Sequence, residues 1–249
     1  MAGVFAELAP FYDALRPLRG HDRARLDAML TGLSLGHQDL VVEVGCGTGR
    51  LTIPLAEMTD ARVMGVDAEA RMIEVARRKD QSGRIRWEQG TAYRIPVGDG
   101  AAALVLMGMV VHLLKQRARA FREARRVLRP NGRLVIWTFT PEHVKRFFLN
   151  EYFPSIPRID GPRFPSQASL ESLLRSVGFS TVTIALEREE ACLGVGELVD
   201  RVRGRYISTL SLVPPLEFRL GLQHLEELRT SHPTHEVRYE LEWALLTAS

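Results

Sequence analysis

Residues 41–50 read VVEVGCGTGR, and this stretch decides the fold. Two valines, Val41 and Val42, lead into Glu43; glycines then alternate with other residues over 45–49, and the helical pattern LTIPLAEM follows. The pattern predicts a buried strand that ends in a tight glycine turn before a helix. Glycine adopts positive φ without steric cost, and its missing side chain lets the backbone touch a ligand. We therefore expect a ligand to bind at this turn.

An acidic residue at the end of the next apolar run narrows the choice of ligand. Asp67 closes the run RVMGVD, at a place where an acid can bind the ribose hydroxyls of a nucleoside. A dinucleotide fingerprint, G-x-G-x-x-G, would require glycine at the position of Arg50. The spacing therefore favours a nucleoside-bearing cofactor other than a nicotinamide dinucleotide.

The match E-x-G-x-G-x-G, from Glu43 to Gly49, resembles motif I of the class I S-adenosylmethionine-dependent methyltransferases. The likeness covers most of the chain, is strongest over 39–140, and is to the small-molecule branch of the family. There the stretch GTAYRIPVGDGAAALVLMGMVVHLL follows a family pattern without a gap, although Thr91 and Ala103 replace two usual aspartates. The resemblance implies S-adenosyl-L-methionine as the cofactor and a small-molecule methyl acceptor as the partner.

The same resemblance assigns the cofactor contacts to the glycine turn and to the strands that follow it. Asp67 would accept hydrogen bonds from both ribose hydroxyls, and Thr91 would accept one from the exocyclic amine of adenine. The expected cofactor-binding residues are Glu43, Gly45, Cys46, Gly47, Asp67, Ala68, Met72, Thr91, Ala92 and Met107.

Two residues are candidates for catalysis, His112 and Tyr12. Methyl transfer from a sulfonium is an in-line displacement, so the protein must mainly align the reactants, and a base is optional. His112 lies beyond the fourth strand, where open α/β sheets place their sites, and it would act either as a base or only as part of the pocket floor. Tyr12 would contact cofactor or substrate, or its helix would simply pack on the domain. No metal-ligand spacing is present, and no metal is expected.

Strand-like runs alternate with helical patterns, which predicts an α/β fold. We expect a doubly wound, mostly parallel seven-stranded sheet with the last strand antiparallel, in one Rossmann-like domain over 1–249 with helical lid insertions. Strands are expected near 40–44, 62–67, 84–88, 102–107, 132–139, 179–186 and 236–247. Helices are expected near 22–33, 50–58, 69–79, 116–128 and 167–177.

Two segments lie outside this alternation and are candidate lid or substrate-binding insertions. Residues 140–166 combine five prolines with five aromatic residues, and residues 194–233 form helices broken at Pro214-Pro215. Both would either cover the pocket or complete the core. The expected acceptor-binding residues are Tyr152, Phe153, Phe164 and Tyr206.

Composition and charge lead to expectations about disulfides, localisation and partners. The chain has 249 residues, 45% of them hydrophobic, a net charge of +3 and two cysteines, which suits a globular protein without a disulfide framework. No secretory signal or bilayer-spanning run is visible, so a cytoplasmic protein without a membrane partner is expected. The arginines of 116–129 lie mostly off one apolar helix face, so they indicate a solvated helix and disfavour nucleic acid as a partner.

Three classes of function stay open. The first is a methyltransferase for a small, partly apolar molecule, because the aromatic insert favours an enclosed pocket. The second is a tRNA or protein methyltransferase, and the third is a non-catalytic cofactor-binding protein of the same fold. The sequence does not identify the acceptor, the methylated atom or the oligomeric state.

Overall fold

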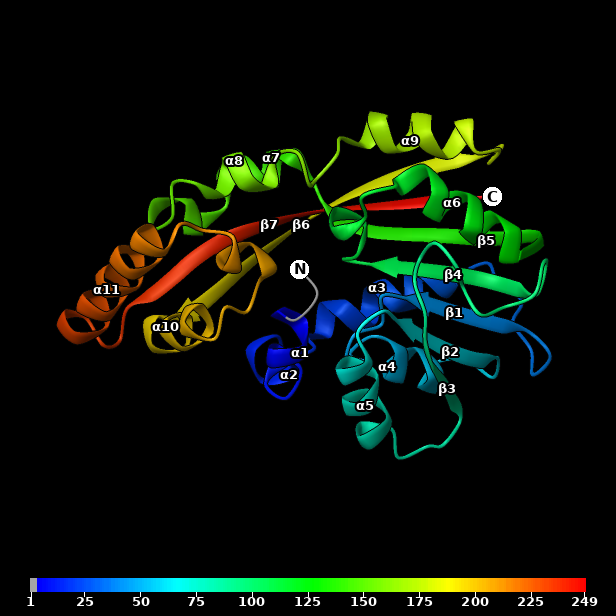
Figure 1. Ribbon diagram of the computed structural model, residues 1–249, viewed down its shortest axis with the longest axis horizontal. Coiled ribbons are helices and arrows are strands. Elements are labelled where there is room, and N and C mark those ends of the chain that lie inside the picture. Colours follow the sequence, from blue (N-terminus) through cyan, green and yellow to red (C-terminus); the bar gives the residue numbers. More distant parts are fainter. Residues whose placement is uncertain (1–3) are drawn as a thin grey trace.

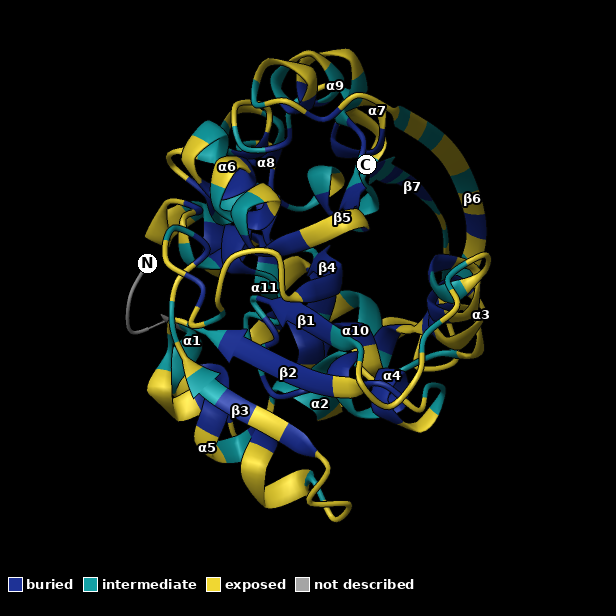
Figure 2. Ribbon diagram, turned by 90° about the vertical axis from the view of Figure 1, so that its right-hand side faces the viewer, coloured by how far each residue is buried: buried dark blue, intermediate teal, exposed yellow. Residues whose placement is uncertain are grey.

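The run that precedes the glycine turn forms the centre of the sheet. The structure is a computed structural model that describes residues 4–249. In it, β1 (Leu40–Val44) lies between β2 (Arg62–Asp67) and β4 (Ala102–Gly108), parallel to both. These strands are buried on both faces, as Figure 2 shows for β1 and β2, and this explains their continuous apolar runs. The strand order reverses at β1 and β4, which opens a crevice at their carboxyl ends.

The complete sheet has seven strands in the order β3-β2-β1-β4-β5-β7-β6 (Figure 1). β3 (Ile85–Gln89) pairs with β2, and β5 (Leu128–Phe139) pairs with β4, both in parallel. β7 (Glu236–Ala248) is antiparallel both to β5 and to β6 (Val182–Gly194). The expected doubly wound sheet with an antiparallel last strand is therefore confirmed.

Helices cover the two faces of this sheet because alternate strand residues point to opposite sides. One apolar cluster joins residues such as Val42 and Val105 to one set of helices, and a second joins Val41 and Leu104 to the other set. On the first face lie α6 (Arg117–Val127) and α9 (Gln167–Ser176); on the second lie α3 (Gly20–Leu30), α4 (Thr52–Glu57) and α5 (Ala70–Lys79). All five expected helices are present.

The last two strands extend beyond the rest of the sheet as a two-stranded ribbon. β6 pairs with β7 over its whole length, from Val182 opposite Ala248 to Gly194 opposite Glu236, whereas the sequence pattern predicts a strand only near 179–186. The prediction was too short because β6 is largely solvent-exposed, so it lacks an apolar run to mark its end (Figure 2). Figure 1 shows the ribbon running from the sheet to a group of helices.

The two irregular segments pack on that ribbon and share a core. The first holds α7 (Pro141–Arg146), η2 (Phe148–Glu151) and α8 (Ile156–Asp160). The second holds α10 (Val195–Arg203), η3 (Ser208–Ser211) and α11 (Pro215–Ser231), with the expected break before Pro215. Their apolar side chains form a third cluster, separate from the two against the sheet. It includes Leu149, Phe153, Ile156, Leu198, Val202, Leu210 and Phe218.

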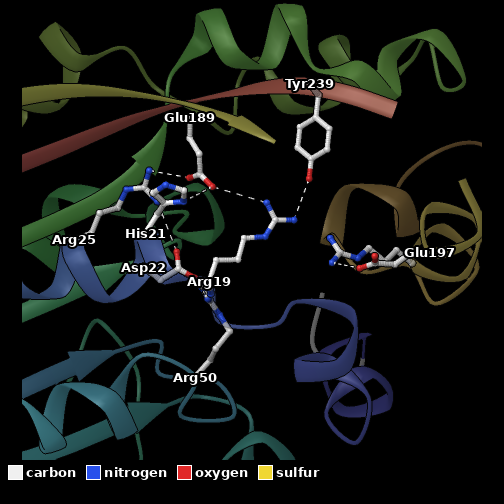
Figure 3. Close-up of polar contacts among 9 residues, drawn as sticks. Arg19, His21, Asp22, Arg25, Arg50, Glu189, Glu197 and Tyr239 are labelled. Carbon is white, nitrogen blue, oxygen red and sulfur yellow. Dashed lines mark hydrogen bonds and ion pairs between the residues drawn. The ribbon is translucent and has the colours of Figure 1, made fainter. Parts of the chain in front are cut away.

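A buried arginine ties α3 to the ribbon (Figure 3). The Arg25 guanidinium lies over the rings of Trp137 and Trp243, at 5.3 and 5.1 Å from their centroids. It donates to the carboxylates of Glu187 at 2.7 Å and Glu189 at 2.9 Å. Arg25 and Glu189 are both buried, so each charge needs compensation, to which Glu187 and Arg19 also contribute.

Further polar contacts connect α3 with the glycine turn and with β7. Asp22 on α3 accepts a hydrogen bond from Arg50 at 2.8 Å, directly after the turn. Arg19 donates to the hydroxyl of Tyr239 on β7 at 3.2 Å (Figure 3). The segment that leads into α3 therefore connects the turn with the ribbon.

None of the helices described within residues 4–249 combines the length and the apolar character that crossing a bilayer requires.

Candidate functional site

The glycine turn has the backbone that its sequence predicts. Gly45, Gly47 and Gly49 have φ of 76°, 55° and 76°, in the region that favours glycine. A Cβ at Gly45 would lie 2.5 Å from Val110, and one at Gly49 would lie 2.5 Å from Trp87. A Cβ at Gly47 would meet no atom within 4 Å. The outer two glycines are therefore required by packing, whereas the space next to Gly47 is available to a ligand.

Asp67 is held at this turn by backbone amides. Its Oδ2 accepts from the N–H of Gly47 and its Oδ1 from the N–H of Glu69, both at 2.8 Å. Burial raises the pKa of Asp67, and these two donors act against that shift. The amides fix the carboxylate beside the turn, in the place expected for a ribose partner.

Glu43 lies beneath the same turn and is fully enclosed. Its Oε2 accepts from the hydroxyl of Thr52 at 2.5 Å. Burial raises the pKa of Glu43 to about 8, although Thr52 and Arg50 oppose the shift. At neutral pH this carboxyl group is largely protonated, because desolvation disfavours the charged form.

A cavity of about 390 Å³ adjoins the turn. It is lined by the carboxyl ends of the central strands, by the N-terminal helices α1 (Val4–Leu8) and α2 (Tyr12–Leu15), and by both irregular segments. Nine of the ten expected cofactor residues line it: Glu43, Gly45, Cys46, Gly47, Asp67, Ala68, Met72, Thr91 and Ala92.

Met107 is the exception and requires a correction. Its side chain is fully buried in the core cluster beneath α6 and does not line the cavity. Because side chains alternate along a strand, the cavity is instead met by Gly108 and by Met109, whose φ is 56° as the chain leaves β4.

Of the four expected acceptor-binding residues, two line the cavity and two do not. Phe164 and Tyr206 line the cavity. Phe153 is fully buried against Phe218, with ring centroids 5.9 Å apart, and Tyr152 meets His224 edge-on at 5.3 Å. Tyr152 and Phe153 therefore belong to the packing between the two irregular segments and lie outside the cavity wall, which corrects the expectation for both.

His112 lines the cavity in η1 (Val111–Leu113), just beyond β4. Its ring stacks on Phe164, with centroids 4.6 Å apart and planes 11° apart. Its Nδ1 is buried without a hydrogen-bond partner among the described residues. Burial, followed by the charges of Arg163, Arg16 and Arg117, holds the pKa of His112 well below its ordinary value. The imidazole is therefore neutral at pH 7, and the same surroundings oppose its protonation.

Tyr12 also lines the cavity, and the residue after it fastens its segment to the glycine turn. Asp13 accepts from the hydroxyl of Thr48 at 2.6 Å and pairs with Lys79. Lys79 in turn donates to the carbonyl of Thr48 at 2.8 Å. The placement of Tyr12 beside the turn thus rests on specific polar contacts rather than on apolar packing alone.

Sequence reasoning missed His143 and Phe139, which both line the cavity. Phe139 ends β5, and His143 follows on α7, where its Nδ1 accepts from the backbone N–H of Glu242 at 3.4 Å. Burial lowers the pKa of His143 to about 4. A usable signal was present, since Phe139 closes a predicted strand at the edge where such sheets bind ligands.

No group of three or more potential metal ligands occurs among residues 4–249.

Comparison with known proteins finds a methyltransferase family model and relatives that are methyltransferases by name. Residues 42–136 match a family model described as a methyltransferase domain. The O-methyltransferase cnsE of Penicillium expansum is 33% identical over an alignment of 171 residues that covers 63% of this chain and 58% of that protein. The chain thus spans less than two thirds of the length of this relative. The ubiquinone/menaquinone biosynthesis C-methyltransferase UbiE of Caulobacter sp. (strain K31) is 27% identical over 213 residues, 73% of this chain and 84% of that protein.

A solved structure extends the likeness to nearly the whole chain. The phosphoethanolamine N-methyltransferase 2 of Haemonchus contortus, in complex with S-adenosyl-L-methionine, aligns with a TM-score of 0.62. The alignment covers 99% of this chain and 56% of that one at 14% identity, so it establishes the fold alone. By their names these three proteins methylate oxygen, carbon and nitrogen, so the likeness does not select the methylated atom.

Proposed function

The chain belongs to the class I S-adenosylmethionine-dependent methyltransferases, and from this premise we propose that it methylates a small, partly apolar acceptor. One observation carries the proposal: a single cavity is lined both by the glycine turn and by the segments 140–166 and 194–233. Cofactor and acceptor would meet between the sheet and these two segments. The segments would then serve as a lid that keeps water from the reacting atoms.

The donor half follows from the residues around the turn. The space beside Gly47 accepts the amino-acid end of the cofactor, and Asp67 accepts hydrogen bonds from the ribose. Thr91 and Ala92, which line the same cavity, hold the adenine. Each assignment combines the family resemblance with the position of the residue at the cavity wall.

The reaction needs alignment more than activation. A lone pair of the acceptor attacks the methyl carbon while the carbon–sulfur bond breaks, and its electrons return to sulfur to give a neutral thioether. An acceptor that bears a proton releases it as the new bond forms. We assign neutral His112 as the group that takes this proton, since its ring lines the cavity just beyond β4.

The nature of the acceptor is inferred from the cavity. Its wall includes Phe139, Phe147, Ile156 and Phe164, which suits an apolar body. A macromolecular acceptor is disfavoured because the arginine-rich helix α6 is partly neutralised: Arg126 pairs with Glu123 at 2.7 Å. We also place the protein in the cytoplasm, since its cysteines are free thiols, as a reducing compartment maintains them.

Calorimetry followed by a turnover assay tests this function. We expect S-adenosylmethionine and its demethylated product S-adenosylhomocysteine to bind with one-to-one stoichiometry. Labelled methyl from the cofactor should then appear on members of a panel of small hydroxyl, amine and activated-carbon compounds, and not on bulk tRNA or protein. Label on a macromolecule would favour the second class of function, and binding without any turnover would favour a non-catalytic role.

The role of His112 has its own test. We expect His112→Asn to lower kcat at least a hundredfold, because a positioned base contributes about 10²–10⁴ in rate, and to leave cofactor affinity unchanged. His37→Asn, at an exposed position, is the matched control. A variant that mainly raises KM would mean that His112 only shapes the pocket.

A further inference from the structure

One wall of the cavity is a row of four rings with a histidine at each end. His143 stacks on Phe139 with centroids 4.0 Å apart, and Phe139 lies 6.2 Å from Phe164. Phe164 then stacks on His112 at 4.6 Å. All four residues line the cavity, although they come from η1, β5, α7 and the stretch before α9. We call them the ring row.

Phe139 meets the cavity by its edge. It is nearly parallel to His143 on one side, at 21°, and to Trp243 on the other, at 22° and a centroid distance of 3.9 Å. Two rings cannot occupy the same face at these distances, so both faces of Phe139 are covered. An aromatic edge carries partial positive charge and attracts the π face of another ring. This part of the wall therefore favours an aromatic or conjugated ligand.

The backbone of β7 determines which nitrogen of His143 carries a proton. The N–H of Glu242 approaches Nδ1 at 3.4 Å, and a backbone amide is always a donor, so Nδ1 must be the acceptor. The pKa of about 4, set by burial against the opposing charge of Glu242, keeps the ring neutral at pH 7. The single ring proton is consequently on Nε2.

Nε2–H of His143 has no hydrogen-bond partner within residues 4–249. The hydrogen bonds of residues 4–249 include none from Nε2 of His143, and this nitrogen is not among the buried unpartnered atoms. Because His143 lines the cavity, its Nε2–H is a donor available to a ligand there. With its proton on Nε2, His143 can only donate to a ligand at this position.

From the ring row we propose that the acceptor is an aromatic or conjugated molecule with an oxygen substituent. Its π face meets the edge of Phe139, and its oxygen accepts a hydrogen bond from Nε2–H of His143. His143 is thereby a specificity-determining residue for the acceptor. The inference rests on the proposed function, since it concerns the acceptor half of the same cavity.

Two isosteric probes test the inference in the presence of saturating S-adenosylhomocysteine. Wild-type protein should bind 2-naphthol roughly three- to tenfold more tightly than 2-methylnaphthalene, the range expected from one neutral hydrogen bond. His143→Phe keeps a ring against Phe139 but removes the donor. It should bind both probes equally, with an affinity for 2-methylnaphthalene close to that of wild type. His143→Gln keeps a donor and should retain part of the preference.

The outcomes separate the two proposals. If S-adenosylhomocysteine binds but neither naphthalene does, or if wild type shows no preference for 2-naphthol, the inference is wrong and the proposed function stands. An unchanged preference in a folded His143→Phe variant overturns it as well. Because that variant leaves the Glu242 amide without its acceptor, its melting temperature is compared with that of His143→Gln; the wild-type preference tests the inference even if His143→Phe does not fold. Failure of S-adenosylhomocysteine to bind would instead refute the proposed function.

Discussion

The donor side and the acceptor side of the cavity are built in different ways. On the donor side, five consecutive residues, 45–49, set the shape through positive φ and missing side chains. On the acceptor side, the ring row brings together residues from Val111–Leu113, the end of β5, α7 and the stretch before α9. The first is a local property of the backbone, whereas the second exists only once distant parts of the chain have packed.

This difference has consequences for stability and for binding. A local turn keeps its form as long as the adjoining strands pair, so changes there should act on the cofactor. The acceptor wall depends on the ribbon and on the contacts that hold the ribbon in place. Substitutions far from the cavity should therefore also alter the acceptor wall. Four substitutions can break or sharpen this contrast.

The largest effect is expected from Arg25→Met, which removes the buried cation between α3 and the ribbon. Glu189 would keep only Arg19 at 3.9 Å and the exposed His21 at 3.3 Å, so the loss should approach the cost of breaking a buried pair, about 3–5 kcal/mol. Chemical denaturation should show this loss, whereas Arg23→Met, in an exposed pair with Glu57, should change stability by less than about 1 kcal/mol. If Arg25→Met were as stable as wild type, the ribbon would not depend on this pair.

Gly47→Val should act on the cofactor instead. The added side chain enters the open space beside the turn and should weaken cofactor binding at least a hundredfold in calorimetry, about 2.7 kcal/mol. The positive φ also strains the fold by about 1–2 kcal/mol. Gly100→Val is the control, since Gly100 has a φ of 64° with nothing within 4 Å and lies outside the cavity. Equal cofactor affinity in both variants would place the cofactor elsewhere.

Asp67→Ala should have a smaller effect on the same ligand. Hydrogen bonds to a charged group contribute about 1.5–3 kcal/mol, so cofactor affinity should fall roughly ten- to a hundredfold. An analogue without the ribose hydroxyls should bind wild type and variant with similar affinity. If both ligands lost affinity equally, Asp67 would act by holding the turn through the Gly47 amide rather than by binding ribose.

The smallest of the four effects is the change in folding stability that Glu43 causes for each unit of pH. Burial raises its pKa to about 8 in the folded protein from an ordinary value of 4.5, so between these values the folded state holds a proton that the unfolded state has lost. Stability should therefore fall as pH rises from about 5 to 8, by at most about 1.4 kcal/mol per unit from this group. Glu43→Gln should flatten the slope while it retains a group that can bond to Thr52. A slope that persists unchanged would assign it to other groups.

The same contrast explains how much of the protein could be predicted from its sequence. The central strands, the turn and Asp67 are encoded in short patterns, because apolar runs, glycine spacing and strand ends are local features. Met107 was expected at the cavity but lies in the core, because the family pattern locates the strand and does not specify which face each of its residues occupies. The cavity is lined by the next residue, Gly108.

The acceptor side was less predictable for a physical reason. Aromatic composition identified the segment 140–166, but Phe153 and Phe164 are indistinguishable by type, and only packing places one in the interior and the other at the cavity. His143 was overlooked because its value as a donor depends on the backbone amide of Glu242, which lies 99 positions away in the sequence.

The segment between the two strands of the ribbon, residues 195–235, can be exchanged without changing the sheet. Gly194 and Glu236 are paired neighbours at the tip, so residues 195–235 leave and return at adjacent points. The sheet thus constrains only the spacing of two ends, and a different length between them changes closure entropy by only about 0.6 kcal/mol per doubling. A segment grafted at this tip from a relative would bring its own part of the acceptor wall and leave the pairing of β5, β7 and β6 intact, provided that it also packs against 140–166, with which it shares a core. For protein engineering, residues 194 and 236 are accordingly the natural points of exchange.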